Sequence, residues 1–336
     1  MQAGQLAPET QRYKVFSTAV DLWTYLAAPF DENLAIYAMT RSGPAGRSWI
    51  EDGRKGAIVI FDDDTRAKMI ANKRNWDARA PIHARSKFYG IGDRDPTSWF
   101  VPFEWRDLGQ LDSRKVVHLQ CHLGVETMAF ALKGAHTTGL DFSSVSVQEA
   151  QRVAREAGLT INYVHADVYD AVDALEGEHF DVVYTGKGAL CYLPDLKAWA
   201  QIVTELLKPG GFLYLLEFHP LLNALGPVHK PGSTYDLVIR HDYLGGRGAA
   251  ERDTSHSYTD GPPLAGDTVH YEWSHGLGEV VTALAQTGLT VENLTETHLL
   301  PWPRWPQMVR TDNGWWEMPR GEPRFPLLYG LKATKS

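Results

Sequence analysis

Carboxylate and imidazole groups follow several apolar, strand-like runs in the middle of the chain. Asp141 follows TTGL, Asp167 follows INYVHA, and Glu217 and His219 end the run FLYLLEFH. Parallel strands bring their carboxyl ends to one edge of a sheet, where open α/β sheets bind ligands. At that edge Asp141 can accept hydrogen bonds from the hydroxyl groups of a ribose, and Asp167 can reach an adenine amino group. The alternative for Asp141 is a carboxylate that only stabilises a helix N-terminus.

The loop after the first of these strands, in the string QCHLGVE, indicates which adenosine ligand to expect. A dinucleotide would require the pattern G-x-G-x-x-G, so that its pyrophosphate can approach the backbone. Two of the three glycines are absent here, and only Gly124 remains. S-adenosylmethionine (SAM) has no phosphate, and this loop needs only space for its methionine moiety. We therefore expect SAM, with Gly124 allowing a close approach of the backbone. The methionine end would be lined by Gln120, Cys121 and His122.

The elements that must position these groups are visible as alternating patterns. From about residue 114 to 217, apolar strands alternate with amphipathic helices, which predicts a parallel sheet covered on both faces. Ser143 or Ser144 is a plausible N-cap of one helix, and Gly158 its C-cap. The last two expected strands, LTVENLTE and FPLLYGLKA, have no helix between them, which predicts an antiparallel edge.

Three zones of different texture give the expected domain organisation. Residues 1–110 are irregular, with helices expected around Val15–Leu26 and Arg66–Ser86. Residues 111–336 would form the ligand-binding domain. Within it, the regular pattern is interrupted at about 220–270 by a polar insertion, which we expect to cap the site.

The composition favours a small-molecule partner. The chain has 336 residues and a formal net charge of -8, so it has no basic footprint for nucleic acid. It contains two cysteines, which argues against a disulfide framework and for a cytoplasmic location. Of these, Cys121 is expected as a small buried side chain rather than a catalytic thiol. The N-terminal string lacks the apolar region of a secretory signal, and no run is long enough to span a membrane. A homodimer stays open.

The run from Val116 to Glu217 resembles the class I SAM-dependent methyltransferases, through LQCHLGVET, GLDFS, HADVYD, FDVVYTGKGALCYLPD and ELLKPGGFLYLLEFHP. More narrowly, these strings together with NKRNWDARAPIHARSKFY and HYEWSHGLGEVVTAL resemble an actinobacterial branch of small-molecule methyltransferases. In that branch a Cys-His pair replaces the first glycines. The resemblance leaves out roughly the first 65 residues. It implies a Rossmann-like, doubly wound sheet of seven strands with an antiparallel last strand. An N-terminal helical lid and a cap insertion after the fifth strand are implied as well.

The resemblance also implies SAM as methyl donor and S-adenosylhomocysteine as product. Beside the two aspartates, Phe142 and Val168 would contact the adenosine, Val168 through its backbone N–H. Thr185 and Gly186, at the end of the fourth expected strand, would lie beneath the methyl group.

The helix expected in NWDARAPIHARSKFY is interpreted as a lid over the cofactor. Trp76 or Tyr89 would pack on the cofactor, and Arg79 would meet its carboxylate. The alternative is ordinary packing of this helix against the domain.

Methyl transfer requires alignment of the reactants and exclusion of water, and a base only where the acceptor must lose a proton. Glu217 and His219 lie on one face of a strand by period-two spacing, so Glu217 could orient His219 as a general base. The alternative is a capping or structural pair. Weaker candidates for contacts with the acceptor are Tyr89, His270, Tyr271 and His275.

No metal is expected. The string YTGKGAL at the fourth-strand end offers no carboxylate, and the histidines lack the H-E-x-x-H spacing.

The distribution of tryptophan suggests an aromatic acceptor. Of eleven tryptophans only Trp199 lies in the central strand–helix region, and the others flank it. Such flanks suit a pocket for a flat organic molecule, with plain packing as the alternative. The related branch includes enzymes that methylate indole C3 in tryptophan-derived cyclodipeptides, which makes an indole-containing secondary metabolite one hypothesis. N- or O-methylation of another small metabolite, an NAD-dependent oxidoreductase and a non-catalytic SAM-binding protein are the alternatives.

Overall fold

The computed structural model describes residues 59–225 and 237–336. The helix expected around Val15–Leu26 and part of the expected insertion lie outside these ranges. One compact unit runs from Asp63 to Ser336. Residues 63–110, which fall in the expected N-terminal helical and lid region, lie in this unit together with the sheet.

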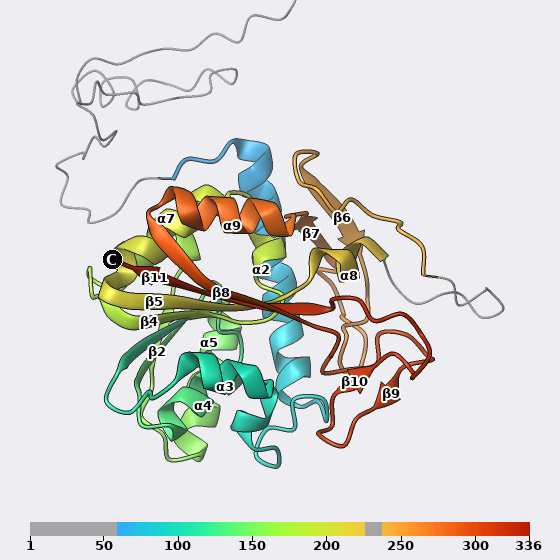
Figure 1. Cartoon of the computed structure of the whole chain (residues 1–336), viewed down its shortest axis with the longest axis horizontal. Coiled ribbons are helices and arrows are strands. Elements are labelled where there is room, and N and C mark those ends of the chain that lie inside the picture. The colour runs from blue at the N-terminus through green and yellow to red at the C-terminus, as the bar shows by residue number, and fades with distance from the viewer. Residues whose placement is uncertain (1–58, 226–236) are drawn as a thin grey trace, which may run out of the picture. The chain divides into compact units, whose positions relative to one another are not determined.

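The main sheet comprises β1 (Lys115–Leu119), β2 (His136–Asp141), β3 (Asn162–His165), β4 (Phe180–Thr185), β5 (Leu207–Phe218), β8 (Leu289–Thr297) and β11 (Leu328–Lys335). Its seven strands follow the order β3-β2-β1-β4-β5-β11-β8 (Figure 1). The first five are parallel, and β11 is antiparallel to both β5 and β8. The expected doubly wound, Rossmann-like sheet with an antiparallel last strand is confirmed. The antiparallel strand is not at the edge, however, because β11 inserts between β5 and β8 and leaves β8 outermost.

Helices cover both faces of this sheet, with α7 and α9 on one face and α3 and α4 on the other (Figure 1). The strong amphipathicity of several helices explains this packing, since one apolar stripe of each is buried. The expected cap of α5 is confirmed, because the Ser143 side chain accepts a hydrogen bond from the Ser146 N–H. The helices are α2 (Asp63–Ala84), α3 (Pro102–Leu108), α4 (Val125–Leu132), α5 (Ser144–Glu156), α6 (Ala171–Ala174), α7 (Leu196–Leu206), α8 (Pro220–Leu225) and α9 (Leu277–Gln286), with short 3-10 turns η1 (Pro96–Trp99), η2 (Val168–Asp170) and η3 (Leu190–Tyr192).

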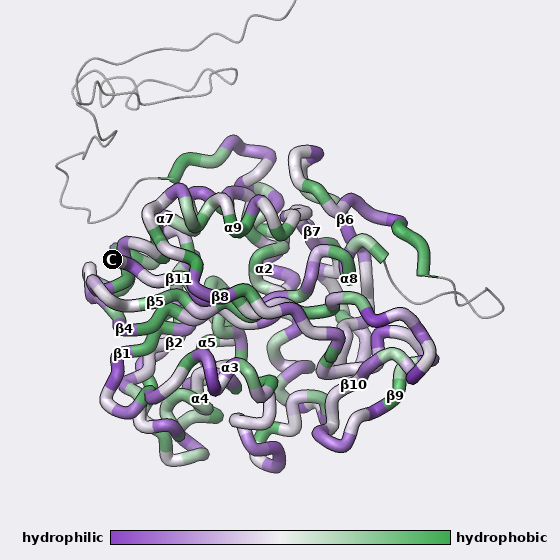
Figure 2. The backbone as a smooth tube through the Cα atoms, viewed as in Figure 1, coloured by the Kyte–Doolittle hydropathy of each residue, from purple (hydrophilic) through white to green (hydrophobic). Residues whose placement is uncertain are grey.

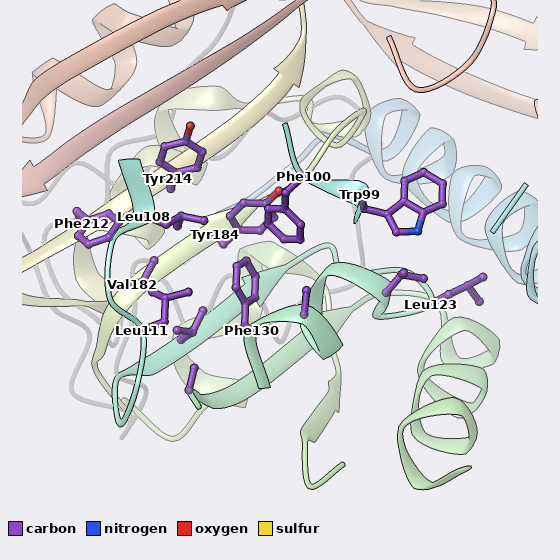
Figure 3. Packing of buried hydrophobic residues seen from close by; sticks show 14 of the residues in the cluster. Trp99, Phe100, Leu108, Leu111, Leu123, Phe130, Val182, Tyr184, Phe212 and Tyr214 are labelled. Carbon is purple, nitrogen blue, oxygen red and sulfur yellow. The ribbon is translucent and has the colours of Figure 1, made fainter. Parts of the chain in front are cut away.

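Aromatic side chains fill the space between the sheet and the helices α3 and α4. The ring of Phe130 packs edge-on against Tyr184 at 4.8 Å and against Phe100 at 5.4 Å (Figure 3). The central strands are hydrophobic along most of their length (Figure 2). Fully burying each such side chain contributes about 1.5–3 kcal/mol, so this core fixes the strand ends that carry the polar groups.

A cap lies at the side of the sheet where β5 leads into α8 (Figure 1). It contains a hairpin of β6 (Ala249–Asp253) and β7 (Val269–Trp273), and a later segment with β9 (Val309–Arg310) and β10 (Trp316–Glu317). Two asparagines of α2 hold the hairpin. The Asn72 side chain accepts from the Tyr271 N–H at 2.7 Å and donates to its carbonyl at 2.9 Å, while Asn75 donates to the Asp267 carbonyl. Helix α2 therefore connects the cap to the sheet domain.

No helix within residues 59–225 or 237–336 is both long and apolar enough to cross a membrane.

Candidate functional site

A cavity of about 110 Å³ lies where β1, β2, β3 and β4 end, beside α2. We call it the strand-end cavity. It brings together many of the residues that the sequence singled out. They are Trp76, Tyr89, Gln120, Cys121, His122, Asp141, Phe142, Asp167, Val168 and Gly186.

The loop after β1 keeps a glycine-type backbone without the glycines. Gln120 and His122 adopt φ angles of 57° and 49°, in the left-handed region that disfavours residues with a side chain. Tertiary hydrogen bonds hold this conformation. The Gln120 side chain donates to the Ala189 carbonyl, and the His122 N–H donates to the Asp141 carboxylate at 2.8 Å. The space a glycine would leave open is thus occupied by polar side chains that face the strand-end cavity.

The imidazole of His122 also belongs to a chain of hydrogen bonds across the site. Its Nδ1 lies 3.0 Å from the Ser146 hydroxyl and its Nε2 lies 2.8 Å from His83 Nδ1. The other ring nitrogen of His83 bonds the hydroxyl of Ser257 in the cap. Burial lowers the pKa of His83 to about 3 and that of His122 well below its ordinary value, so both rings are neutral near pH 7. This chain ties the cap, α2 and α5 to the loop.

Three of the expected cofactor-binding residues, Gly124, Thr185 and Arg79, do not line the strand-end cavity. Gly124 is not among the described residues that line the strand-end cavity. Its φ is +69°, and a Cβ there would come within 2.3 Å of the Tyr163 hydroxyl, so the glycine makes room for a core tyrosine. Thr185 is fully buried, and its hydroxyl has no partner among the described residues. Of the pair at the end of β4, Gly186 alone lines the cavity, because alternate strand residues point to opposite faces.

The aspartate at the end of β2 is buried, and some of the acceptor positions of its carboxylate are taken up by hydrogen bonds. One Asp141 oxygen accepts from the Ser143 N–H and the other from the His122 N–H, both at 2.8 Å. Burial raises the pKa of Asp141 to about 6, although these two hydrogen bonds lower it. An ionised carboxylate has about four acceptor positions, so roughly two stay available for a ligand.

The aspartate at the end of β3 caps the next turn. Asp167 accepts from the Tyr169 N–H at 3.0 Å, and burial raises its pKa. It faces the same cavity as the neighbouring Val168.

A second cavity, of about 510 Å³, lies between α2, α8, the hairpin β6–β7 and residues 301–304. We call it the cap cavity. It contains Arg79, Glu217, His270 and His275. The two cavities share a wall formed by Trp76, Tyr89, Glu126, Lys187, Gly188, Tyr192 and Tyr258. Arg79 lines only the cap cavity, and its guanidinium lies 5.5 Å from the Trp76 ring.

The carboxylate of Glu217 is taken up by backbone donors. It accepts hydrogen bonds from the N–H groups of Ala189 and Leu190 at 2.9 Å, and from those of Gly188 and Phe218. Burial raises its pKa to about 6 against the effect of these bonds. Glu217 therefore holds the loop that follows β4, and this loop reaches the shared wall at Gly188.

His219 does not pair with Glu217, so the expected contact between them is wrong. Its Nε2 lies 2.9 Å from Glu296, and its Nδ1 accepts from the Leu221 N–H. The strand alternation ends at Phe218, and His219 bonds the first turn of α8 through its carbonyl. In the described chain it lines neither cavity.

Tyr271 faces away from both cavities. Its hydroxyl donates to Glu251 at 2.9 Å, and its backbone pairs with Asn72 of α2. His270 and His275 do line the cap cavity. The alternation of side chains along β7 explains why His270 and Tyr271 point to opposite faces, whereas His275 follows the end of this strand.

The sequence analysis missed a charged pair on the shared wall. Lys187 lies 3.3 Å from Glu126, and their side chains are only 6% and 17% exposed. A lysine between two glycines, directly after an apolar strand, was a signal that could have identified it. Tyr258, whose hydroxyl lies 2.6 Å from that of Tyr89, was missed because it comes from the irregular insertion.

No group of three or more histidine, cysteine, aspartate or glutamate side chains in the described ranges is arranged to hold a metal ion.

Comparison with known proteins gives matches to several methyltransferases. A methyltransferase domain family matches residues 117–213. The ubiquinone biosynthesis O-methyltransferase of Histophilus somni is 35% identical over 171 residues, which is 48% of this chain and 71% of that protein. The enzyme of the same name from Actinobacillus pleuropneumoniae is 32% identical over 143 residues, 39% of this chain and 61% of that protein. This chain covers 42% of a third enzyme of this name, from Pectobacterium atrosepticum.

Among solved structures, an S-adenosylmethionine-dependent methyltransferase from Clostridium acetobutylicum aligns with a TM-score of 0.49 and 15% identity, over 73% of this chain and 93% of that one. The identity and coverage shared with the Histophilus somni enzyme, together with the matched methyltransferase domain, show that this chain belongs to the class I SAM-dependent methyltransferases.

Proposed function

We propose that this methyltransferase transfers the methyl group of SAM, bound in the strand-end cavity, to a small aromatic acceptor bound in the cap cavity. The observation that carries the proposal is the wall shared by the two cavities. In-line displacement requires the sulfonium and the nucleophile to meet at one point that is shielded from water. The shared wall is where such a meeting is possible.

The cofactor is placed by the groups at the strand ends. Asp141 accepts hydrogen bonds from the ribose hydroxyls, and Asp167 with the Val168 N–H contacts the adenine. Phe142 lies beside the adenosine. The methionine end lies along Gln120, Cys121 and His122, with Trp76 packed on the cofactor and Arg79 near its carboxylate.

Catalysis is chiefly alignment. The S–CH₃ bond breaks as the bond to the acceptor forms, and S-adenosylhomocysteine leaves with the electron pair on sulfur. An acceptor O–H or N–H must also lose a proton, and Glu126 is the carboxylate on the shared wall in the described chain. We assign the proton to Glu126, while Glu217 acts as a positioning residue for the loop after β4.

The acceptor is aromatic because rings line much of the cap cavity. Trp302 lies 5.0 Å from Phe218 and stacks near Tyr258, and the cavity also contains Phe88 and Trp99. A volume of several hundred Å³ suits a drug-sized molecule. An indole methylated at C3, from secondary metabolism, fits this lining. The name of the curated relatives favours a second candidate, O-methylation of a phenol.

The test is incubation of the full chain with SAM labelled on its methyl group and a panel of indoles, phenols and aromatic amines. We expect label in at least one aromatic product, with the loss of label transfer in Asp141→Ala. Trp302→Ala should raise the KM for the acceptor while the Kd for SAM stays unchanged. Transfer only to aliphatic acceptors, or a Trp302→Ala variant with unchanged kinetics, would contradict the aromatic assignment.

A further inference from the structure

The lining of the cap cavity contains charged side chains as well as aromatic rings. Its charged lining residues are Arg79, Lys187, Arg252, Arg304, Glu126, Glu217 and Glu272. Four of these are cationic and three acidic, in a chain whose formal net charge is -8. Their hydrogen bonds and ion pairs show which of these charged side chains has no partner among the described residues.

The acidic groups are already occupied. Glu217 is bonded to backbone N–H groups, and Glu126 is paired with Lys187. Glu272 has one oxygen 3.2 Å from Arg252 Nε and the other 3.6 Å from His270 Nε2. Burial would raise the pKa of Glu272, but the contacts with His270 and Arg252 lower it, so Glu272 is an anion near pH 7.

Arg304 is the cation left without a partner. It makes no hydrogen bond or ion pair with any residue in the described ranges, and its Nε is shielded from solvent. Burial lowers the pKa of Arg304, which reflects the cost of holding this charge away from water. Arg252 and Glu272 are its charged neighbours, and Glu272 has no unpartnered oxygen to offer. A partly buried guanidinium whose Nε is shielded from solvent is strongly stabilised by an anion that binds it through two parallel hydrogen bonds.

Arg79 is also buried, at 5% exposure, and its Nε lacks a partner in the described chain. It lies next to Trp76, and its Nη2 is 3.4 Å from His270 Nδ1. In the proposed function this arginine meets the carboxylate of the cofactor. One unpaired guanidinium, that of Arg304, then remains for the acceptor. A single guanidinium matches an acceptor with one negative charge better than an acceptor with a phosphate.

We propose that the acceptor is an aromatic carboxylic acid, whose carboxylate is held by Arg304 on the cap and whose ring lies between Trp302 and the shared wall. This inference rests on the proposed function. It explains why Trp302 and Arg304, two residues apart in an irregular segment, both line the same cavity. It also gives the cap a role in choosing the acceptor, separate from binding of the cofactor.

The test compares matched acids and amides. The full chain is saturated with S-adenosylhomocysteine and titrated calorimetrically with three pairs: indole-3-acetate and its amide, phenylacetate and its amide, and benzoate and its amide. We expect at least one acid to bind about tenfold or more tightly than its amide, because a charge-assisted bidentate pair replaces a neutral hydrogen bond. Arg304→Gln should abolish this preference, and Arg304→Lys should keep part of it.

Arg247→Gln is the matched control. Arg247 lies just before β6, pairs with Asp242, and does not line the cap cavity; its side chain is 83% exposed. This variant should retain the full preference for the acid. Equal affinity for acids and amides, failure of every acid to bind, or a preference that survives Arg304→Gln would each overturn the inference. Binding of S-adenosylhomocysteine is measured first, and its failure would instead count against the proposed function.

Discussion

The two cavities are built in different ways from the same chain. Apart from α2, Tyr89 and Tyr258, the strand-end cavity is lined by residues 118–193, which alternate between strands and helices. The cap cavity draws on α2, the loop after β4, the end of β5, the hairpin β6–β7 and residues 301–304. The first follows from the order of strands in the sheet, whereas the second depends on contacts between segments that are far apart in sequence. A fold of this kind can keep the cofactor site and alter the acceptor site by changing the cap.

The largest test of this division is substitution of Asp141 by alanine. We expect the Kd for SAM to rise by at least about two orders of magnitude, because each hydrogen bond to a charged group contributes roughly 1.5–3 kcal/mol and Asp141 bonds two ribose hydroxyls in the proposed complex. Calorimetric titration with SAM measures it.

The control for this substitution is Asp141→Asn, which keeps one acceptor oxygen and should lose less affinity. The carboxylate also accepts from the N–H groups of His122 and Ser143, so thermal unfolding is recorded for both variants. A folded Asp141→Ala variant that binds SAM with unchanged affinity would refute the ribose assignment.

The strand-end cavity was accessible to prediction because its residues directly follow strands. Asp141 and Asp167 lie where the apolar runs end, and the structure places both in one cavity. Gly124 lies against Tyr163, 39 residues later in the chain, whose ring leaves no room for a Cβ at that position. Nothing in the local pattern shows that contact.

The lining of the cap cavity could largely not be predicted from the sequence, for a physical reason. Its walls come from segments without a regular hydrophobic period, so position in the sequence says nothing about which side chains face inward. Arg304 lies in such a Pro/Trp-rich segment. The expected Glu217–His219 pair failed for a related reason, because the strand alternation that placed both on one face stops where α8 begins.

Lys187→Met tests the wall that the two cavities share. The substitution leaves the carboxylate of Glu126 largely buried without its partner, so we expect the free energy of unfolding to fall by about 3 kcal/mol. The double variant Glu126→Gln/Lys187→Met should recover most of this loss. Chemical denaturation of the single and double variants measures the coupling.

The matched control is Lys115→Met, which breaks the half-exposed pair with Glu178 and should cost less than about 1 kcal/mol. If Lys187→Met were no more damaging than Lys115→Met, the Glu126–Lys187 pair would not be a buried part of the shared wall.

A smaller effect, about tenfold, is expected in the pH dependence of SAM binding to the strand-end cavity. Because burial raises the pKa of Asp141 to about 6, lowering the pH from 7 to 5 converts most of this carboxylate to the neutral acid, which is a poorer acceptor for two ribose hydroxyls. The Kd for SAM should therefore rise about tenfold over this range, and Asp141→Asn should show no such step.

Protonation of Asp141 does not weaken SAM binding by unfolding the protein, because it makes the folded state more stable as the pH falls. A carboxyl whose pKa is higher in the folded chain than its ordinary value of 3.8 stabilises the fold as the pH falls from about 6 towards 4. His83 and His122, whose pKa values are lowered by burial, act in the opposite direction below pH 6.5, so thermal unfolding is followed at each pH. An affinity for SAM that stays constant from pH 7 to pH 5 in a folded protein would show that the cofactor does not depend on the ionised Asp141, and the strand-end cavity would lose its main anchor.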